Sequence, residues 1–260
     1  MTPLDKISPK NQSAIKAIDI IEFLALCENR PQRLCDIASA LSMSTSTVLR
    51  FLIALTECGY IHQDTETQRY SLTMKICNIA NKVSENLDLY DMALPFMRKL
   101  SNECNESVCL AIEQNMTVVY IGVVWGPDQM VRTMQRIGNR APMHCTGVGK
   151  VLLLNYSNSD IDELIKTKQL TKFTNNTITT KVELLQELDS VRNSDIAYDN
   201  EECEIGARCI AVPIRNYTGK IIAGMSVTGP IFRMDDNILS TMSIFLINAG
   251  AELSKLLGWN

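Results

Sequence analysis

One stretch decides the fold of the N-terminal region: residues 42–52, which read SMSTSTVLRFL. Its first three residues are a tight polar break, and Ser44 or Thr45 is a suitable N-cap for the helix that follows. Apolar residues then recur at helical spacing, at Val48, Leu49, Leu52 and Leu55. Gly59 is a suitable C-cap. The stretch therefore predicts a helix that begins directly after a short turn.

The flanking residues supply the partners of this helix. A helix is predicted after Ser13 as N-cap, ending near residues 28–31, and a shorter helix places Leu34, Ile37, Ala38 and Leu41 on one face. Residues 60–63 and 69–72 read as two strands, joined by the polar residues 64–68. Three short helices and a hairpin within about sixty residues form the winged helix-turn-helix order.

The remainder of the chain contains both strand and helix patterns. We expect a helix over 73–86 and another over 87–104 with Pro95 in its first turn. Strands are expected at 107–112, 117–124, 130–135, 208–215 and 220–228, and helices at 147–154, 160–168, 181–193 and 235–257. Strand pairs with flanking helices predict an α+β domain with an antiparallel sheet. The predicted divisions are a flexible tail 1–12, a winged helix-turn-helix domain 13–72, a linker helix 73–89 and a larger domain 90–260.

Composition limits the classes of function. The 260 residues carry a net charge of −4, which argues against nonspecific nucleic-acid binding by the whole molecule. Between Asp36 and Glu57, however, Arg50 is the only charged residue, and an acid-free stretch suits contact with phosphates as well as it suits an ordinary polar surface. There is no apolar run of eighteen residues, no signal peptide and no CxxC pair among nine cysteines. We therefore expect a cytoplasmic protein without membrane span, disulfide framework, metal site or cofactor.

Several motifs occur in a consistent order along the chain. They are STSTVLRFL at 44–52, RYSL at 69–72, PMHCTGVGK at 142–150, DNEE at 199–202, GARCIAVP at 206–213 and SVTGP at 226–230. With these motifs the sequence resembles the IclR family of transcriptional regulators over nearly its whole length, and most of all the KdgR-like, sugar-acid subgroup. The resemblance implies a GAF-like effector-binding domain and a homodimer or homotetramer. Most members repress transcription and some activate it.

The predicted DNA contacts lie on the third helix and the wing. The hydroxyls at its start can donate to phosphates, where the helix also offers free N–H groups, although simple capping would use the same residues. Arg50 can reach a guanine edge or a phosphate. Arg69 can hold a phosphate or enter the minor groove, or it is a plain surface charge. The predicted DNA-binding residues are Ser44, Thr45, Ser46, Thr47, Arg50 and Arg69.

A second predicted site lies in the larger domain. Gly147 and Val148 open a helix whose N–H groups can bind a carboxylate, although the glycines there can instead serve close packing. The resemblance implies that Asp199, Cys209, Ser226 and Thr228 line the pocket of a small acid; a structural polar network is the alternative. Ser226 and Thr228 alternate on one strand and so face the same side. Thr228 replaces the serine common in the family, which narrows the pocket. Met130 and Ala141 are expected in an apolar wall.

Two other classes of protein compete with this interpretation. Cys209, His144 and Asp199 can imitate a cysteine-nucleophile triad, but no nucleophile motif surrounds Cys209. A ligand-binding module without a DNA role would leave the third helix and the wing unexplained. The sequence therefore predicts a non-enzymatic homo-oligomer that reads a pseudo-palindromic double-stranded operator. It most resembles a repressor of a carbon-source operon, with an activator as the alternative. We expect that a small carboxylate binds the larger domain and shifts the protein between a state that binds DNA and a state that does not.

Overall fold

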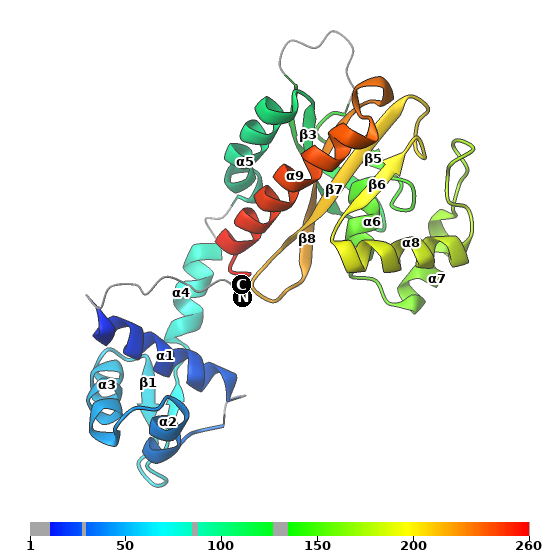
Figure 1. The fold of residues 1–260 in the computed structure, drawn as a ribbon. Helices are drawn as coiled ribbons and strands as arrows, with labels where there is room; N and C mark the ends of the chain where they lie inside the picture. Colours follow the sequence, from blue (N-terminus) through cyan, green and yellow to red (C-terminus); the bar gives the residue numbers. More distant parts are fainter. Residues whose placement is uncertain (1–10, 28–29, 85–87, 127–134, 260) are drawn as a thin grey trace. The chain divides into compact units, whose positions relative to one another are not determined.

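Figure 1 shows the protein as a computed structural model, which describes residues 11–27, 30–84, 88–126 and 135–259. The chain divides into two compact units, residues 1–87 and residues 88–260, and each has its own hydrophobic core. Within the described ranges no single helix is both long and apolar enough to cross a membrane. Two short helices of unit 1 meet those criteria only as a pair that bends by 113°.

Unit 1 has the predicted winged helix-turn-helix order. Its elements are α1 (Gln12–Leu26), α2 (Leu34–Ala40), α3 (Thr45–Glu57), β1 (Ile61–Gln63), β2 (Tyr70–Leu72) and α4 (Lys75–Ser84). The bent pair is α2 and α3, and the turn between them includes Ser42 in the left-handed region, at φ 52°. Strands β1 and β2 form an antiparallel hairpin, and Gln32 extends it by a bridge to Tyr70. This hairpin is the wing.

Local signals explain most boundaries in unit 1. Ser44 caps α3, as one of the two predicted candidates, and its side chain accepts from the N–H of Thr47. Gly59 follows the end of α3 with φ 77°, a conformation that favours glycine. The prediction for α1 was wrong by two residues, because the helix begins at Gln12 after Asn11 and no side chain caps it. The N–H groups of the first turn are exposed there, so water can satisfy them.

Unit 2 is the predicted α+β domain. Its elements are α5 (Leu89–Cys104), β3 (Ser107–Glu113), β4 (Val118–Val124), β5 (Arg140–Ala141), α6 (Gly147–Leu153), α7 (Asn158–Lys168), α8 (Lys181–Ser194), β6 (Ala197–Asn200), β7 (Ala207–Arg215), β8 (Ile221–Pro230), the 3-10 helix η1 (Ile231–Arg233) and α9 (Asp236–Leu256). The six strands form one antiparallel sheet in the order β5-β4-β3-β8-β7-β6.

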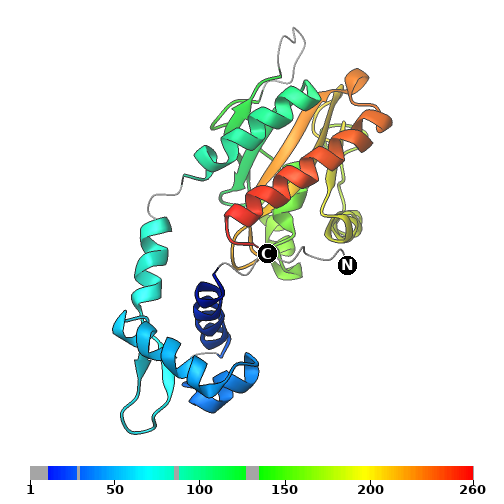
Figure 2. The same ribbon diagram turned by 60° about the vertical axis from the view of Figure 1, so that its left-hand side comes forward.

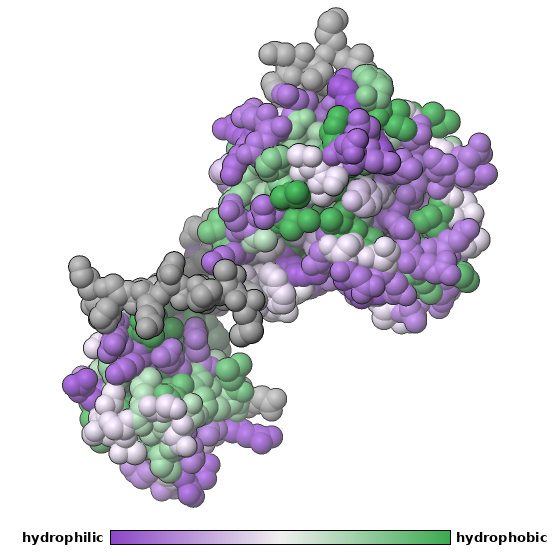
Figure 3. All heavy atoms as spheres, viewed as in Figure 1, coloured by the Kyte–Doolittle hydropathy of each residue, from purple (hydrophilic) through white to green (hydrophobic). Residues whose placement is uncertain are grey.

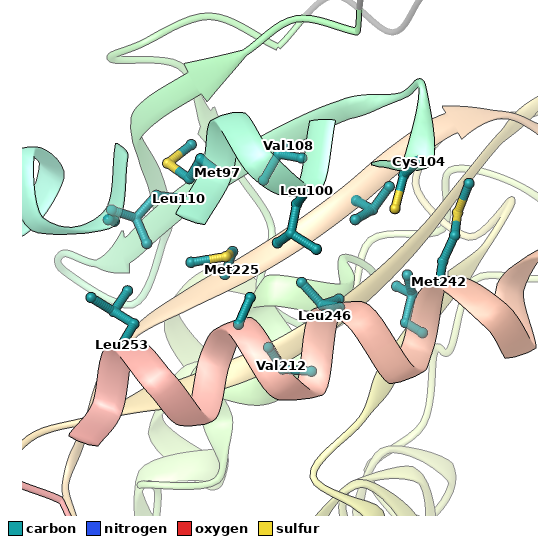
Figure 4. Packing of buried hydrophobic residues seen from close by; sticks show 14 of the residues in the cluster. Met97, Leu100, Cys104, Val108, Leu110, Val212, Met225, Met242, Leu246 and Leu253 are labelled. Carbon is teal, nitrogen blue, oxygen red and sulfur yellow. The ribbon is translucent and has the colours of Figure 1, made fainter. Parts of the chain in front are cut away.

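Helices cover both faces of this sheet, as Figures 1 and 2 show. Helices α5 and α9 lie on one face, where Met97, Leu100, Leu246 and Leu253 pack against sheet residues such as Met225 (Figure 4). Helix α6 lies on the other face and contacts β7 and β8, with α7 and α8 outside it. Because successive strand residues alternate between faces, strands β3, β7 and β8 contribute to two separate cores.

Three expectations about unit 2 need correction. Pro95 is the seventh residue of α5, so it lies in the second turn and not in the first. The strand expected at 130–135 lies almost entirely outside the described residues, and Gln135, which is described, is not in a strand. Strand β6 was not predicted, because Asp199 and Asn200 are poor strand formers and the strand depends on pairing with β7.

Candidate functional sites

The first candidate site is the outer face of α3. Val48 and Leu52 point into the core of unit 1, whereas Thr45, Ser46 and Arg50 are exposed. A helix repeat of 3.6 residues places Ser46 and Arg50 opposite the buried pair, whereas Thr45 is exposed because it is the first residue of the helix. The guanidinium carbon of Arg50 lies 5.5 Å from the ring centroid of Phe51. The exposed face thus presents two hydroxyls and one cation to solvent.

The remaining two hydroxyls of the predicted DNA group hold the start of the helix. Ser44 Oγ accepts from the backbone N–H of Thr47 at 3.3 Å and lies 2.8 Å from Thr47 Oγ1. Thr47 is half-buried, and Ser46 Oγ lies 3.1 Å from Ser44 Oγ. Ser44 and Thr47 therefore have a clear capping role, which leaves Thr45 and Ser46 as the freer hydroxyls.

Arg69 has a structural partner of its own. Its Nη1 donates to the carbonyl of Pro31 at 3.3 Å, and the residue is half-buried. The bond ties β2 to the segment that bridges the wing at Gln32. Since a guanidinium has five donors, this contact still leaves others for a phosphate.

Two apolar residues lie on the same helix face: Leu49, which the sequence placed in the apolar stripe with Val48, and Ile53, which sequence reasoning did not select. Leu49 and Ile53 are 38% and 52% exposed, and both line a groove of about 530 Å³ beside Gln63 and Gln68 of the wing. Apolar side chains at i and i+4 on an otherwise polar face were the available signal. In the major groove, such side chains suit the methyl group of thymine.

The second candidate site is a row of side chains on the α6 face of the sheet. Asp199 of β6 pairs with Cys209 of β7, and Cys209 pairs with Thr228 of β8. Ser226 lies two residues along β8, on the same face. All four residues are buried. The structure therefore brings together the four positions that are far apart in sequence.

Gly147 lies against the middle of this row. A Cβ atom at Gly147 would lie 3.1 Å from Cys209 Sγ and 3.2 Å from the Cβ of Ala211. Burial raises the pKa of the Cys209 thiol to about 12, and the neighbouring Thr228, Ser226 and Gly147 N–H offset this only in part. Cys209 is thus a neutral thiol.

The start of α6 is largely occupied by its own residues. Thr146 Oγ1 accepts from the N–H of Gly149 at 3.2 Å and donates to the carbonyl of Pro142 at 2.7 Å. A Cβ atom at Gly149 would lie 2.3 Å from the carbonyl oxygen of Met143, so this glycine serves close packing. Val148 packs its side chain on Gly224 of β8. Among the described residues the N–H of Val148 has no acceptor, so it is left for a ligand.

Asp199 is the one acidic group of the row. Its Oδ1 accepts from the N–H of Glu202 at 2.8 Å and of Cys203 at 3.3 Å. Burial raises its pKa to about 7, against an ordinary value of 3.8. Near neutral pH the carboxyl is therefore partly protonated, and in that form it can donate a hydrogen bond.

A buried ion cluster supports the loop that follows Asp199. Lys150 of α6 is 1% exposed, and its Nζ donates to Glu202 at 2.6 Å, to Glu187 at 2.9 Å and to the carbonyl of Tyr198 at 2.8 Å. Glu202 Oε2 is also buried and has no hydrogen-bond partner within the described ranges. The cluster fixes the backbone of Glu202 beneath Asp199. Sequence reasoning did not select Lys150, because its partners are 37 and 52 residues away.

The other predicted site residues lie elsewhere. Met130 is outside the described residues. Ala141 lies on β5, at the opposite edge of the sheet from β6, where it lines a pocket of about 270 Å³ with His144 and Phe173. The structure therefore does not bring Ala141 next to the row that contains Asp199.

The alternative catalytic triad is not assembled. His144 Nε2 lies 3.1 Å from the carbonyl of Thr171, and no contact among the described residues joins His144 to Cys209. A thiol whose pKa is about 12 is also a poor nucleophile. In the part of the chain that the structure describes, no three His, Cys, Asp or Glu side chains cluster as metal ligands would.

Comparison with known proteins is consistent across the chain. Residues 13–65 match the family model of the IclR helix-turn-helix domain, and residues 81–255 match that of the bacterial transcriptional regulator IclR C-terminal domain. The HTH-type transcriptional regulators KdgR of Dickeya chrysanthemi and of Escherichia coli are 35% and 34% identical over 99% of this chain, covering 83% and 97% of their own lengths. The repressor AllR of E. coli is 27% identical over 98% of this chain and 93% of its own.

Solved structures agree with these matches. The structure of the Thermotoga maritima IclR protein is 28% identical and covers 95% of this chain and 99% of its own, with a TM-score of 0.63. The C-terminal domain of E. coli KdgR covers 66% of this chain and all of its own, at 32% identity and a TM-score of 0.60.

Proposed function

The chain belongs to the IclR family of bacterial transcriptional regulators, and we propose that it is a cytoplasmic repressor of a carbon-source catabolic operon. In this proposal residues 13–72 read the operator, residues 73–89 link the domains and residues 90–260 bind a small organic acid. The acid favours the state that does not bind DNA and so releases the operator.

The observation that carries the DNA role is the exposed face of α3. Thr45, Ser46 and Arg50 offer two hydroxyl donors and one guanidinium, and no acidic side chain lies between Asp36 and Glu57. A guanidinium matches guanine O6 and N7 or a phosphate, and the hydroxyls match phosphates. The loss of a guanine contact costs about 1–3 kcal/mol of binding free energy for each half-site.

Mobility-shift titration with DNA from the protein's own promoter region tests this role. Arg50→Ala is expected to weaken binding by at least tenfold, while the thermal stability of the chain stays unchanged. Arg192→Ala, on the exposed side of α8, removes the same charge from unit 2 and serves as the matched control. Equal binding by wild type and Arg50→Ala would remove Arg50 from the interface.

The row from Asp199 to Thr228 supports the effector role. Its members are hydroxyls, a neutral thiol and a carboxyl that is partly protonated near pH 7. The nearest buried cation, Lys150, is already bonded to two carboxylates. We infer that hydroxyl donors, the N–H of Val148 and protonated Asp199 hold the carboxylate, without a formal positive charge.

Operator titrations with a panel of keto, hydroxy and sugar acids test the coupling. The acid that is the effector is expected to weaken operator binding. Asp199→Ala and Ser226→Ala are each expected to abolish this effect of the acid on operator binding. An acid that raises the melting temperature without ever changing operator affinity contradicts the coupling. In a promoter fusion, deletion of the gene is expected to raise expression; a fall would identify an activator instead.

Self-association is also part of the proposal. Helix α9 exposes Ile244, Phe245 and Ile247, and green atoms lie over this helix among purple ones in Figure 3. Apolar side chains gathered on a surface favour association, and an operator with two-fold symmetry requires paired winged helices. Sedimentation analysis is expected to give a homodimer or homotetramer; a monomer at micromolar concentration would contradict this.

A further inference from the structure

The hydroxyl of Ser107 is buried without a partner. Ser107 is 1% exposed, and its Oγ has no hydrogen bond to any group that the structure describes. Removing a hydroxyl from water without a replacement bond costs free energy. Two other buried serines of unit 2 are satisfied: Ser101 donates to the carbonyls of Glu106 and Trp125, both at 3.1 Å, and Ser254 accepts from the N–H of Arg215 at 3.0 Å. Of the four buried serines among the described residues of this unit, Ser107 alone has a buried hydroxyl oxygen without a partner.

The strand register places Ser107 in the row of the candidate effector site. Ser107 of β3 pairs with Thr228 of β8, which pairs with Cys209 of β7, which pairs with Asp199 of β6. Directly paired residues of antiparallel strands project to the same side of the sheet. The row therefore continues across four neighbouring strands and has a carboxyl at one end and an unpartnered hydroxyl at the other.

We infer that Ser107 is a specificity-determining contact for the effector, and that the effector is a hydroxylated acid with a second polar group remote from the end that binds at Asp199. The inference rests on the proposed effector function. Three strand spacings separate the backbones of β6 and β3 by about 14 Å. A two- or three-carbon acid reaches only neighbouring strands, whereas a hydroxylated chain of about five or six carbon atoms can extend along the row.

Isothermal titration of the full chain with gluconate, a six-carbon hydroxylated acid, and lactate, a three-carbon acid, tests this inference. Wild type is expected to bind gluconate more tightly than lactate. Ser107→Ala is expected to weaken gluconate binding about tenfold and to leave lactate binding within about twofold. Because Ser107→Ala breaks no intramolecular bond, the urea midpoint is expected to stay the same or to rise. The control Ser101→Ala loses two bonds, so its urea midpoint falls while gluconate binding is kept.

Several results would overturn the inference. These are equal gluconate affinity in wild type and Ser107→Ala, an equal loss for gluconate and lactate, lactate binding without gluconate binding, or binding of neither acid by wild type. The proposed function fails differently. Suppose that an acid of the wider panel changes operator affinity, and that Ser107→Ala changes neither gluconate binding nor the effect of that acid on operator affinity. The proposed regulatory function is then kept, and the role of Ser107 is contradicted. If no acid changes operator affinity, the effector function itself falls.

Discussion

Replacing Asp199 by Asn is expected to stabilise unit 2, and more so at high pH. Asp199 is 7% exposed, and burial raises its pKa from 3.8 to about 7. The difference between these two values, at about 1.36 kcal/mol for each pH unit, is about 4 kcal/mol. An amide at this position keeps the oxygen that accepts from the N–H groups of Glu202 and Cys203, but it cannot ionise.

The direction of the pH dependence follows from the proton count. Below about pH 4 the carboxyl is protonated in both folded and unfolded chains, so its burial carries no charge penalty. Between pH 4 and 7 the unfolded chain loses this proton and the folded chain keeps it, so the free energy of unfolding falls as pH rises. Above pH 7 both states are ionised and the full penalty remains. The free energy of unfolding of Asp199→Asn is therefore expected to exceed that of wild type by up to about 4 kcal/mol at pH 8. The two values are expected to converge toward pH 4.

Urea unfolding followed by tryptophan fluorescence measures this difference. Both tryptophans, Trp125 and Trp259, belong to unit 2, so the signal reports on that unit. Asp189→Asn, on the exposed side of α8, is the matched control and is expected to show no such pH-dependent gain. A constant difference between wild type and Asp199→Asn from pH 5 to pH 8 would refute a buried carboxyl with a raised pKa.

The buried lysine, the cap of α3 and one cysteine pair each have an expected outcome that can be measured. Lys150→Met is expected to destabilise unit 2 by about 3–5 kcal/mol in urea unfolding, because it leaves the buried Glu202 carboxylate unpaired; a loss below about 1 kcal/mol would contradict a buried ion cluster. Ser44→Ala is expected to cost about 1 kcal/mol of unit 1 stability by thermal circular dichroism, since it removes the cap of α3, and an unchanged melting temperature would argue against the cap. Iodoacetamide is expected to modify Cys203 before Cys145 in mass-spectrometric mapping. The reason is that a hydrogen bond from Cys145 lowers the pKa of the partly exposed Cys203 thiol and raises the pKa of the buried Cys145 thiol. Modification in the reverse order would contradict this pairing.

Local patterns in the sequence were sufficient for most elements of the fold. The helix at Thr45–Glu57 carries its cap, its apolar stripe and its terminal glycine within sixteen residues, and the hairpin at 216–219 carries its own turn residues. Such signals act between neighbours along the chain, so they can be read without the tertiary structure. Strand β6 lacked them, because its sequence AYDN is unremarkable and only pairing with β7 makes it a strand.

The candidate sites show the same division. The motifs indicated Asp199, Cys209, Ser226 and Thr228, but their union in one row depends on strand register. Only the register of β3 against β8 adds Ser107 to them.

By itself, the sequence determined the winged helix-turn-helix order, the α+β class and the family, because each depends on patterns repeated along short segments. The tertiary structure decided which residues are free to act. It assigned Gly149 to close packing, and it joined Lys150 to a carboxylate 52 residues away. These outcomes depend on contacts between distant segments and on burial, which changes the free energy of a charge or a hydroxyl without any mark in the local sequence.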